Sequence, residues 1–275
     1  MSNNRLQRAQ FFAERGRVEE AIREYEALLC ETPDNAIVHG LLAMRLADLR
    51  QFEPAVYHAR EAMRRAPDLG FSHFAMASVL YKSRQLASAS ESMEEAIRLE
   101  PENPSYFHVL ASIRYAQRQR TGALQAIETC LRLAPENVAA LNLRSSLLRM
   151  RGDHVQADLV TNHALAVDPE SSLAHVNLGL SFVAKGRYER SFYEFDEALR
   201  LDPHSTAAHA GIAEAQSARA ITILYVFLAM VGVFLAWVST HGPASGCTEV
   251  AVSFTLVFVV LLLKRHVWPL LSRSR

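Results

Sequence analysis

Proline recurs at intervals of 34 residues along most of this chain. The series is Pro33, Pro67, Pro101, Pro135, Pro169 and Pro203. It takes up six of the ten prolines in the sequence, so composition alone does not explain the spacing. A fixed period of roughly 20–50 residues indicates one supersecondary unit copied in series, because each copy buries its apolar face against its neighbours. The sequence therefore predicts a repeat architecture.

Each 34-residue repeat contains two blocks of apolar residues at three- and four-residue spacing, which predicts two helices. Two positions are small in every copy. Counted from 31 residues before the proline, the eighth residues are Ala9, Ala43, Ala77, Ala111, Ser145 and Gly179, and the twentieth are Ala21, Ala55, Ala89, Ala123, Ala157 and Ser191. Small residues at matched positions let two helix backbones approach closely. Proline then ends the second helix, and the Asp, Asn or Ser beyond it can cap the next one.

These positions resemble the tetratricopeptide repeat (TPR) family, whose pattern combines small and aromatic residues with a closing proline. The sixth copy matches it through Leu178, Gly179, Phe182, Gly186, Ser191, Phe195, Ala198 and Pro203, and the first through Ala9, Phe12, Gly16, Ala21, Tyr25 and Pro33. The resemblance implies an all-α fold, a right-handed α-solenoid of six helix-turn-helix repeats plus a seventh helix. The expected repeats are 2–35, 36–69, 70–103, 104–137, 138–171 and 172–205, with a partial repeat at 206–218, which together make a solenoid domain of 2–218.

One position departs from the family pattern, because its fourth residue is usually a large aromatic. Here it is His39, His73, His175 and His209 in four repeats, and Arg5, Phe107 and Leu141 in the others. Neighbouring helix axes lie about 8–10 Å apart, whereas metal ligands converge on an ion at about 2 Å. We therefore interpret these histidines as packing residues with nitrogens at the surface, and predict no metal site and no cofactor.

Other reactive groups are also few. The sequence contains no Gly-rich phosphate loop and no His-Glu-x-x-His motif, so we expect a protein without enzymatic activity. Cys30 and Cys130 both fall late in a second helix, where we expect buried thiols. The chain carries 29 basic and 29 acidic residues, which argues against a nucleic-acid binder.

The amphipathic pattern ends near residue 219. Ile221–Val238 contains no charged residue and, as a helix, would span about 27 Å, close to the ~30 Å hydrocarbon core of a bilayer. A second apolar stretch, 250–263, is shorter, and a re-entrant or interfacial segment is the alternative to a second crossing. We favour a transmembrane helical hairpin. The expected membrane anchor is 219–275, with helices at about 220–238 and 247–263.

The distribution of basic residues predicts the topology. Arg219 precedes the first apolar stretch, four Lys or Arg residues follow the second, and the connector 239–249 has no Lys or Arg. By the positive-inside rule, both termini and the repeat domain face the cytoplasm of a multi-pass membrane protein. Arginine outnumbers lysine 26 to 3, a bias that favours a high-GC genome and so a bacterial inner membrane. A eukaryotic organelle membrane is the alternative.

In the TPR family the first helix of each repeat lines a concave groove. The corresponding residues here are Ile37, Met44, Phe71, Phe74, Tyr81, His108, Tyr115, Asn142, Arg149, Leu173, Val176, Leu180 and Val183. We expect about half of them to pack between repeats. Phe71, Phe74 and Tyr81 form one helical stripe, and a groove with aromatic and methionine walls suits an amphipathic helix or an apolar peptide.

A basic cluster lies mainly around the turns inside the repeats. It comprises Arg114, Arg118, Arg120, Arg144, Arg149 and Arg151. We interpret these residues as solvated turn charges, and an acidic partner segment or a phosphate is the alternative.

These features predict a non-catalytic, membrane-anchored TPR scaffold or adaptor that binds protein partners through its groove on the cytoplasmic side. One alternative is a regulatory or assembly subunit of a membrane enzyme or secretion complex, with the transmembrane hairpin as its main interface. Another is a peptide or chaperone receptor that uses the tail only for location. The sequence leaves the partner and the oligomeric state open.

Overall fold

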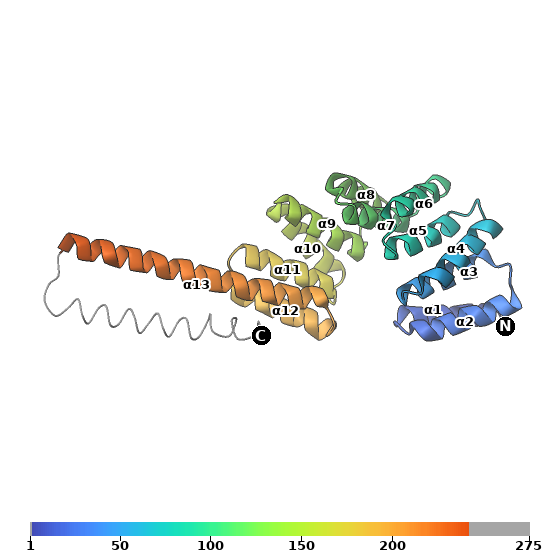
Figure 1. The fold of residues 1–275 in the computed structure, drawn as a ribbon, viewed down its shortest axis with the longest axis horizontal. Coiled ribbons are helices and arrows are strands. Elements are labelled where there is room, and N and C mark those ends of the chain that lie inside the picture. The colour runs from blue at the N-terminus through green and yellow to red at the C-terminus, as the bar shows by residue number, and fades with distance from the viewer. Residues whose placement is uncertain (1, 242–275) are drawn as a thin grey trace. The chain divides into compact units, whose positions relative to one another are not determined.

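The computed structural model describes residues 2–241, which form thirteen α-helices and no strand (Figure 1). The helices are α1 (Ser2–Glu14), α2 (Val18–Glu31), α3 (Ala36–Asp48), α4 (Phe52–Arg65), α5 (Gly70–Lys82), α6 (Leu86–Leu99), α7 (Pro104–Ala116), α8 (Arg120–Leu133), α9 (Val138–Arg151), α10 (His154–Val167), α11 (Ser172–Ala184), α12 (Tyr188–Leu201) and α13 (Thr206–His241). The second apolar stretch, 250–263, and the predicted helix at 247–263 lie outside these residues.

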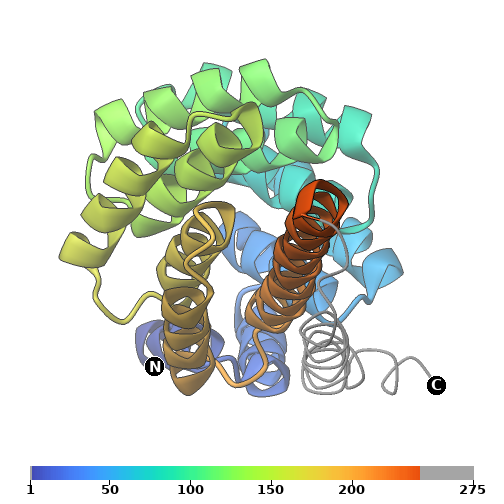
Figure 2. The same cartoon turned by 90° about the vertical axis from the view of Figure 1, so that its left-hand side faces the viewer.

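The helices divide into two compact units, an N-terminal unit of residues 1–160 and a C-terminal unit that begins at Thr161. Within the N-terminal unit, α1–α8 pair as four hairpins, and each hairpin packs on the next helix or hairpin along the chain. For example, α5 contacts α6 of its own repeat, α3 and α4 of the preceding repeat and α7 of the following one. Within the C-terminal unit, α11 packs on α12, and both pack on α13 (Figure 2). This TPR-like stacking of hairpins confirms the all-helical solenoid fold.

Every small residue at the eighth and twentieth positions of the repeats is buried. The closest approach occurs in the C-terminal unit, where the side chain of Phe195 is fully buried. A Cβ atom on Gly179 or on Gly211 would each lie 2.5 Å from Cε1 of Phe195. The ring is therefore held between the backbones of α11 and α13, which explains why both positions are glycine.

The turn inside each repeat has one residue at positive φ, and these residues are 34 positions apart. They are Gly16 (+71°), Arg50 (+59°), Arg84 (+66°), Arg118 (+64°), Gly152 (+92°) and Gly186 (+68°). The left-handed conformation costs a residue with a Cβ atom roughly 1–2 kcal/mol. Three consecutive repeats of the N-terminal unit therefore place an arginine in a conformation that favours glycine.

The predicted helix caps are present at most of the turns that carry the repeating proline. The side chains of Asn35, Asn137 and Ser205 each accept a hydrogen bond from the backbone N–H three residues later. Asn103 does so two residues later. The Ser171 side chain makes no capping hydrogen bond.

Helix α13 differs from the others in length and environment. Its first turns pack against α12 through Ala208 and Ala215, both fully buried. Between residues 221 and 236 its apolar side chains are mostly exposed, and the 18-residue window of highest mean hydropathy, at 2.2, contains no buried residue. Within residues 2–236, this is the one helix that is long and apolar enough to cross a membrane.

Candidate functional site

The predicted groove residues of the N-terminal unit lie on its first helices. Ile37 and Met44 are on α3, Phe71, Phe74 and Tyr81 on α5, His108 and Tyr115 on α7, and Asn142 and Arg149 on α9. We call the surface formed by α3, α5 and α7 the first-helix face. The remaining predicted residues, Leu173, Val176, Leu180 and Val183, are on α11 of the C-terminal unit.

These residues differ in how much of each side chain reaches solvent. Ile37, Tyr115 and Leu173 are exposed, and Met44, Phe71, Phe74, Tyr81, His108, Arg149 and Leu180 are half-buried. Asn142, Val176 and Val183 are buried, at 2%, 2% and 8% exposure, so these three belong to the packing between helices. Sequence alone does not separate the two groups, since the helical periodicity is the same for both.

Phe71 and Phe74 have a packing role. A Cβ atom on Gly40 would lie 2.7 Å from the Phe71 ring, so this ring fills the gap between α3 and α5. The Phe74 ring is 6.0 Å from that of Phe71 and stacks on Tyr106 of α7 at 5.1 Å. The three rings join three consecutive first helices. Met44 and Tyr81 are half-buried like Phe71 and Phe74 but are not part of this aromatic row.

Tyr106, which the sequence analysis did not single out, ends this aromatic row. Its hydroxyl donates a hydrogen bond to Glu100 Oε2 at 2.8 Å. Burial, followed by this hydrogen bond, raises the pKa of Tyr106 above its usual value, so the phenol stays protonated. The hydrogen bond links the start of α7 to the preceding proline turn.

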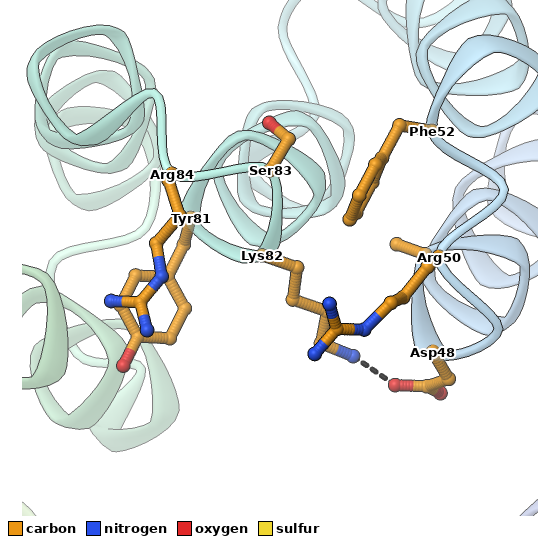
Figure 3. A pocket seen from close by; sticks show the side chains of 8 residues that line it. Asp48, Arg50, Phe52, Tyr81, Lys82, Ser83 and Arg84 are labelled. Carbon is orange, nitrogen blue, oxygen red and sulfur yellow. Dashed lines mark hydrogen bonds and ion pairs between the residues drawn. The ribbon is translucent and has the colours of Figure 1, made fainter.

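A pocket of about 480 Å³ opens between the α3–α4 turn and the α5–α6 turn (Figure 3). Its lining consists of Ala47, Asp48, Arg50, Phe52, Tyr81, Lys82, Ser83 and Arg84. Lys82 pairs with Asp48, which also lies 3.2 Å from Arg45. The pocket thus combines two aromatic side chains with an excess of positive charge, next to Tyr81 of the first-helix face. The sequence does mark Arg50 and Arg84, because they occupy the turn position that is Gly16, Gly152 or Gly186 in other repeats.

Three of the four histidines at the fourth position hydrogen-bond to the prolines that define the repeat. Nε2 of His39, His73 and His175 lies 3.0, 2.8 and 3.1 Å from the carbonyl oxygen of the proline six residues earlier. Since a carbonyl only accepts, each Nε2–H donates. From the sequence we expect these histidines to pack between helices with their nitrogens at the surface. Instead, one ring nitrogen of each makes a specific hydrogen bond across the proline turn. No group of three His, Cys, Asp or Glu residues in the described part of the chain is placed to hold a metal ion.

His39 has a second partner, His58 of α4. The two Nδ1 atoms are 2.9 Å apart, and the rings stack at 5.1 Å. Because Nε2 of neutral His39 carries its proton, His58 Nδ1 donates to His39 Nδ1. Burial first, and then the positive charge of His39, lower the pKa of His58 to about 4. Burial likewise lowers the pKa of His39.

The two described cysteines differ. Cys130 is buried as expected, and burial raises the pKa of its thiol. Cys30 is exposed, so the expectation for it was wrong. The buried place in the first repeat that corresponds to Cys130 is taken by Leu28, and Cys30 lies two residues further along α2, on its outer side.

Comparisons with known proteins agree with this geometry. One tetratricopeptide repeat model matches residues 108–157 and 162–206, and a second matches 72–103. The matches support the tetratricopeptide repeat family. TPR folds are protein-interaction scaffolds and are generally non-catalytic. No curated protein sequence matches this one significantly.

Several solved structures share the fold. Pseudomonas aeruginosa PilF is 18% identical, with 78% of this chain and 97% of that chain covered and a TM-score of 0.61. Yeast Tom70 is 19% identical, with 81% of this chain and 47% of that chain covered and a TM-score of 0.63. The Cut9–Hcn1 hetero-tetramer of the APC/C is 14% identical, with 78% of this chain and 43% of that chain covered and a TM-score of 0.67. The chain spans less than half the length of the Tom70 and Cut9–Hcn1 chains. At these identities the likeness concerns the fold alone.

Proposed function

We propose that this protein is a non-catalytic, membrane-anchored TPR adaptor that binds a protein partner on its first-helix face and holds it at the membrane surface. The observation that carries the proposal is helix α13, which starts as part of the last repeat and continues as a bare apolar helix. Large side chains such as Leu228, Val233 and Leu235 are 53–72% exposed there. A helix that is apolar on all sides needs an apolar environment, and a bilayer supplies one.

The partner we propose is an amphipathic helix or an apolar peptide. Outside the aromatic row, the predicted groove residues of the first-helix face that bring apolar groups to solvent are Ile37, Met44, Tyr81 and Tyr115. Methionine adapts its shape to an apolar ligand, and tyrosine supplies a large contact area with few rotatable bonds, while the stacked hairpins hold both on ordered helices. Arg50 and Arg84 in the adjoining pocket favour a ligand with an acidic residue at one end.

The topology that we propose places the repeats and both termini in the cytoplasm, at a bacterial inner membrane. The support is the charge pattern, with Arg219 before the apolar run and basic residues after residue 263. In this arrangement the anchor concentrates the adaptor at the surface where its partner is needed. A subunit of a membrane enzyme or secretion complex that works through its transmembrane segment is the competing proposal.

Crosslinking affinity purification from detergent tests the adaptor function. The variant Met44→Ser/Tyr81→Ser alters the first-helix face without touching the Phe71–Phe74–Tyr106 row, and we expect it to lose most of the partner. Tyr57→Ser is the control, since Tyr57 is 60% exposed on the second helix α4. Equal partner recovery in all three proteins would rule out the first-helix face.

Removal of residues 220–275 separates the two proposals. An adaptor that binds through its repeats keeps its partner in solution, whereas a subunit that works through its membrane segment loses it. Alkaline carbonate extraction of the full chain tests the anchor itself, which we expect to stay with the membrane fraction.

A further inference from the structure

The two ends of the helical hairpins carry opposite charge. The five-residue turns inside the repeats, 14–18, 48–52, 82–86, 116–120, 150–154 and 184–188, hold ten Lys or Arg and three Asp or Glu. The turns with the repeating proline hold one Lys or Arg and nine Asp or Glu. These turns are 31–35, 65–69, 99–103, 133–137, 167–171 and 201–205. Since successive helices of a hairpin are antiparallel, the two sets of turns lie at opposite ends of each repeat.

Helix α13 leaves the C-terminal unit at the basic end of its last hairpin. It begins after the proline turn 201–205 and runs back along α12 to the level of the α11–α12 turn. There, Tyr188 Oη lies 2.8 Å from Thr222 Oγ1, and Arg219 lies 2.9 Å from Glu189. A further repeat would turn at residue 220, 34 after Gly186, but α13 continues as a helix into its apolar part.

A pocket of about 420 Å³ lies at this point, lined by Gly186, Arg187, Tyr188, Glu189, Arg190 and Arg219. Arg187 and Arg190 are exposed, and Lys185 precedes them in the turn. Glu189 is the one acidic residue of the lining and is paired with Arg219. The pocket therefore carries an excess of positive charge within one helical turn of Ile221, where the bare apolar surface of α13 begins.

We propose that this pocket binds the headgroup phosphate of an anionic phospholipid, an inference that rests on the proposed membrane anchor. The polar headgroup layer adds about 5–7 Å to each side of the hydrocarbon core, which is about four residues of helix. If hydrocarbon begins at Ile221, Arg219 and the α11–α12 turn lie in that layer. Arginine guanidinium groups match a phosphate with two parallel hydrogen bonds, and Tyr188 suits the interface.

A lipid fits this pocket better than an acidic peptide does. The cations adjoin an apolar helical surface that includes Ile221 and Leu224, both exposed. Along α13 the cationic pocket comes first and the apolar surface follows. A phospholipid has its phosphate next to its acyl chains, so one molecule contacts both surfaces. An acidic peptide would meet only the charged part.

Native mass spectrometry of the full chain in detergent, with added phosphatidylglycerol or phosphatidylcholine, tests this site. We expect phosphatidylglycerol to bind more tightly, and Arg187→Gln/Arg190→Gln to weaken it about 25-fold, at roughly fivefold per cation, with phosphatidylcholine unchanged. The control Arg200→Gln/His204→Gln removes basic groups from the opposite end of the same hairpin and should have no effect. Soluble glycerol 3-phosphate at the same concentration should not displace the lipid.

Each contrary result has a distinct meaning. Equal binding of the two lipids, or an unchanged affinity in Arg187→Gln/Arg190→Gln, overturns the lipid site while leaving the anchor intact. Full displacement by glycerol 3-phosphate shows a phosphate site that does not need a lipid, and also overturns it. Release of the full chain by alkaline carbonate refutes the membrane anchor instead.

Discussion

Gly211→Ala tests how α13 is joined to the last repeat, because two opposing effects meet at this residue. In an open helix interior, replacing glycine by alanine stabilises by about 0.5–1 kcal/mol. Here the new Cβ atom would lie 2.5 Å from Cε1 and 2.6 Å from Cζ of Phe195. The ring cannot retreat, since Gly179 closes its other side at an equally short distance.

The size of the effect follows from these contacts. An extra methyl group in a well-packed core costs about 1–3 kcal/mol, and a ring clamped on both sides favours the upper part of that range. Subtracting the helix-propensity gain leaves a net destabilisation of about 2 kcal/mol. If the C-terminal unit opens locally, this value corresponds to about 30-fold less protection of its amides.

Hydrogen exchange of the full chain, followed by mass spectrometry of peptides from α11, α12 and the first part of α13, measures this change. Gly232→Ala is the matched control in the same helix, because no atom lies within 4 Å of its added Cβ. In a Phe195→Leu background the cost of Gly211→Ala should shrink, and the double-mutant cycle gives the coupling. Unchanged or slower exchange in Gly211→Ala would refute the argument that the ring is clamped.

Three further predictions concern other parts of the chain. Gly186→Ala meets no atom within 4 Å but has φ of +68°, so backbone strain alone should destabilise it by about 1 kcal/mol, seen as a fall of about 2–4 °C in a thermal melt. Burial lowers the pKa of His58 to about 4 and lowers that of His39, so between about pH 6.5 and 4 the unfolded chain binds protons that the native chain does not. Denaturant unfolding should therefore show stability falling from pH 7 to 5, less steeply in His58→Gln; an equal slope would contradict this. Leu228→Asp places a charge in the exposed apolar part of α13 at a cost of about 3 kcal/mol for membrane insertion, so carbonate should extract more of it than of wild type.

The parts of the fold that depend on local spacing could be predicted from the sequence. The 34-residue period, the two helices of each repeat, the buried small residues and most of the caps are properties of residues close together in the chain. The same holds for the length and apolar character of α13 beyond residue 220.

The candidate site was less predictable, since its surfaces depend on neighbouring repeats. Periodicity placed Met44, Tyr81 and Asn142 on equivalent faces of their helices, but packing buries Asn142 and leaves the other two accessible. The pocket beside Tyr81 also needs two turns that are 34 residues apart in sequence.

By itself the sequence determined the repeat, its helices and the apolar tail, because each follows from side-chain type and spacing within one helical hairpin. Tertiary structure decided the ring clamped between Gly179 and Gly211 and the aromatic row of Phe71, Phe74 and Tyr106. It also decided that α13 leaves its unit beside a basic turn. The physical reason is that these features depend on distances between separate elements, which only the packing of one repeat on the next sets.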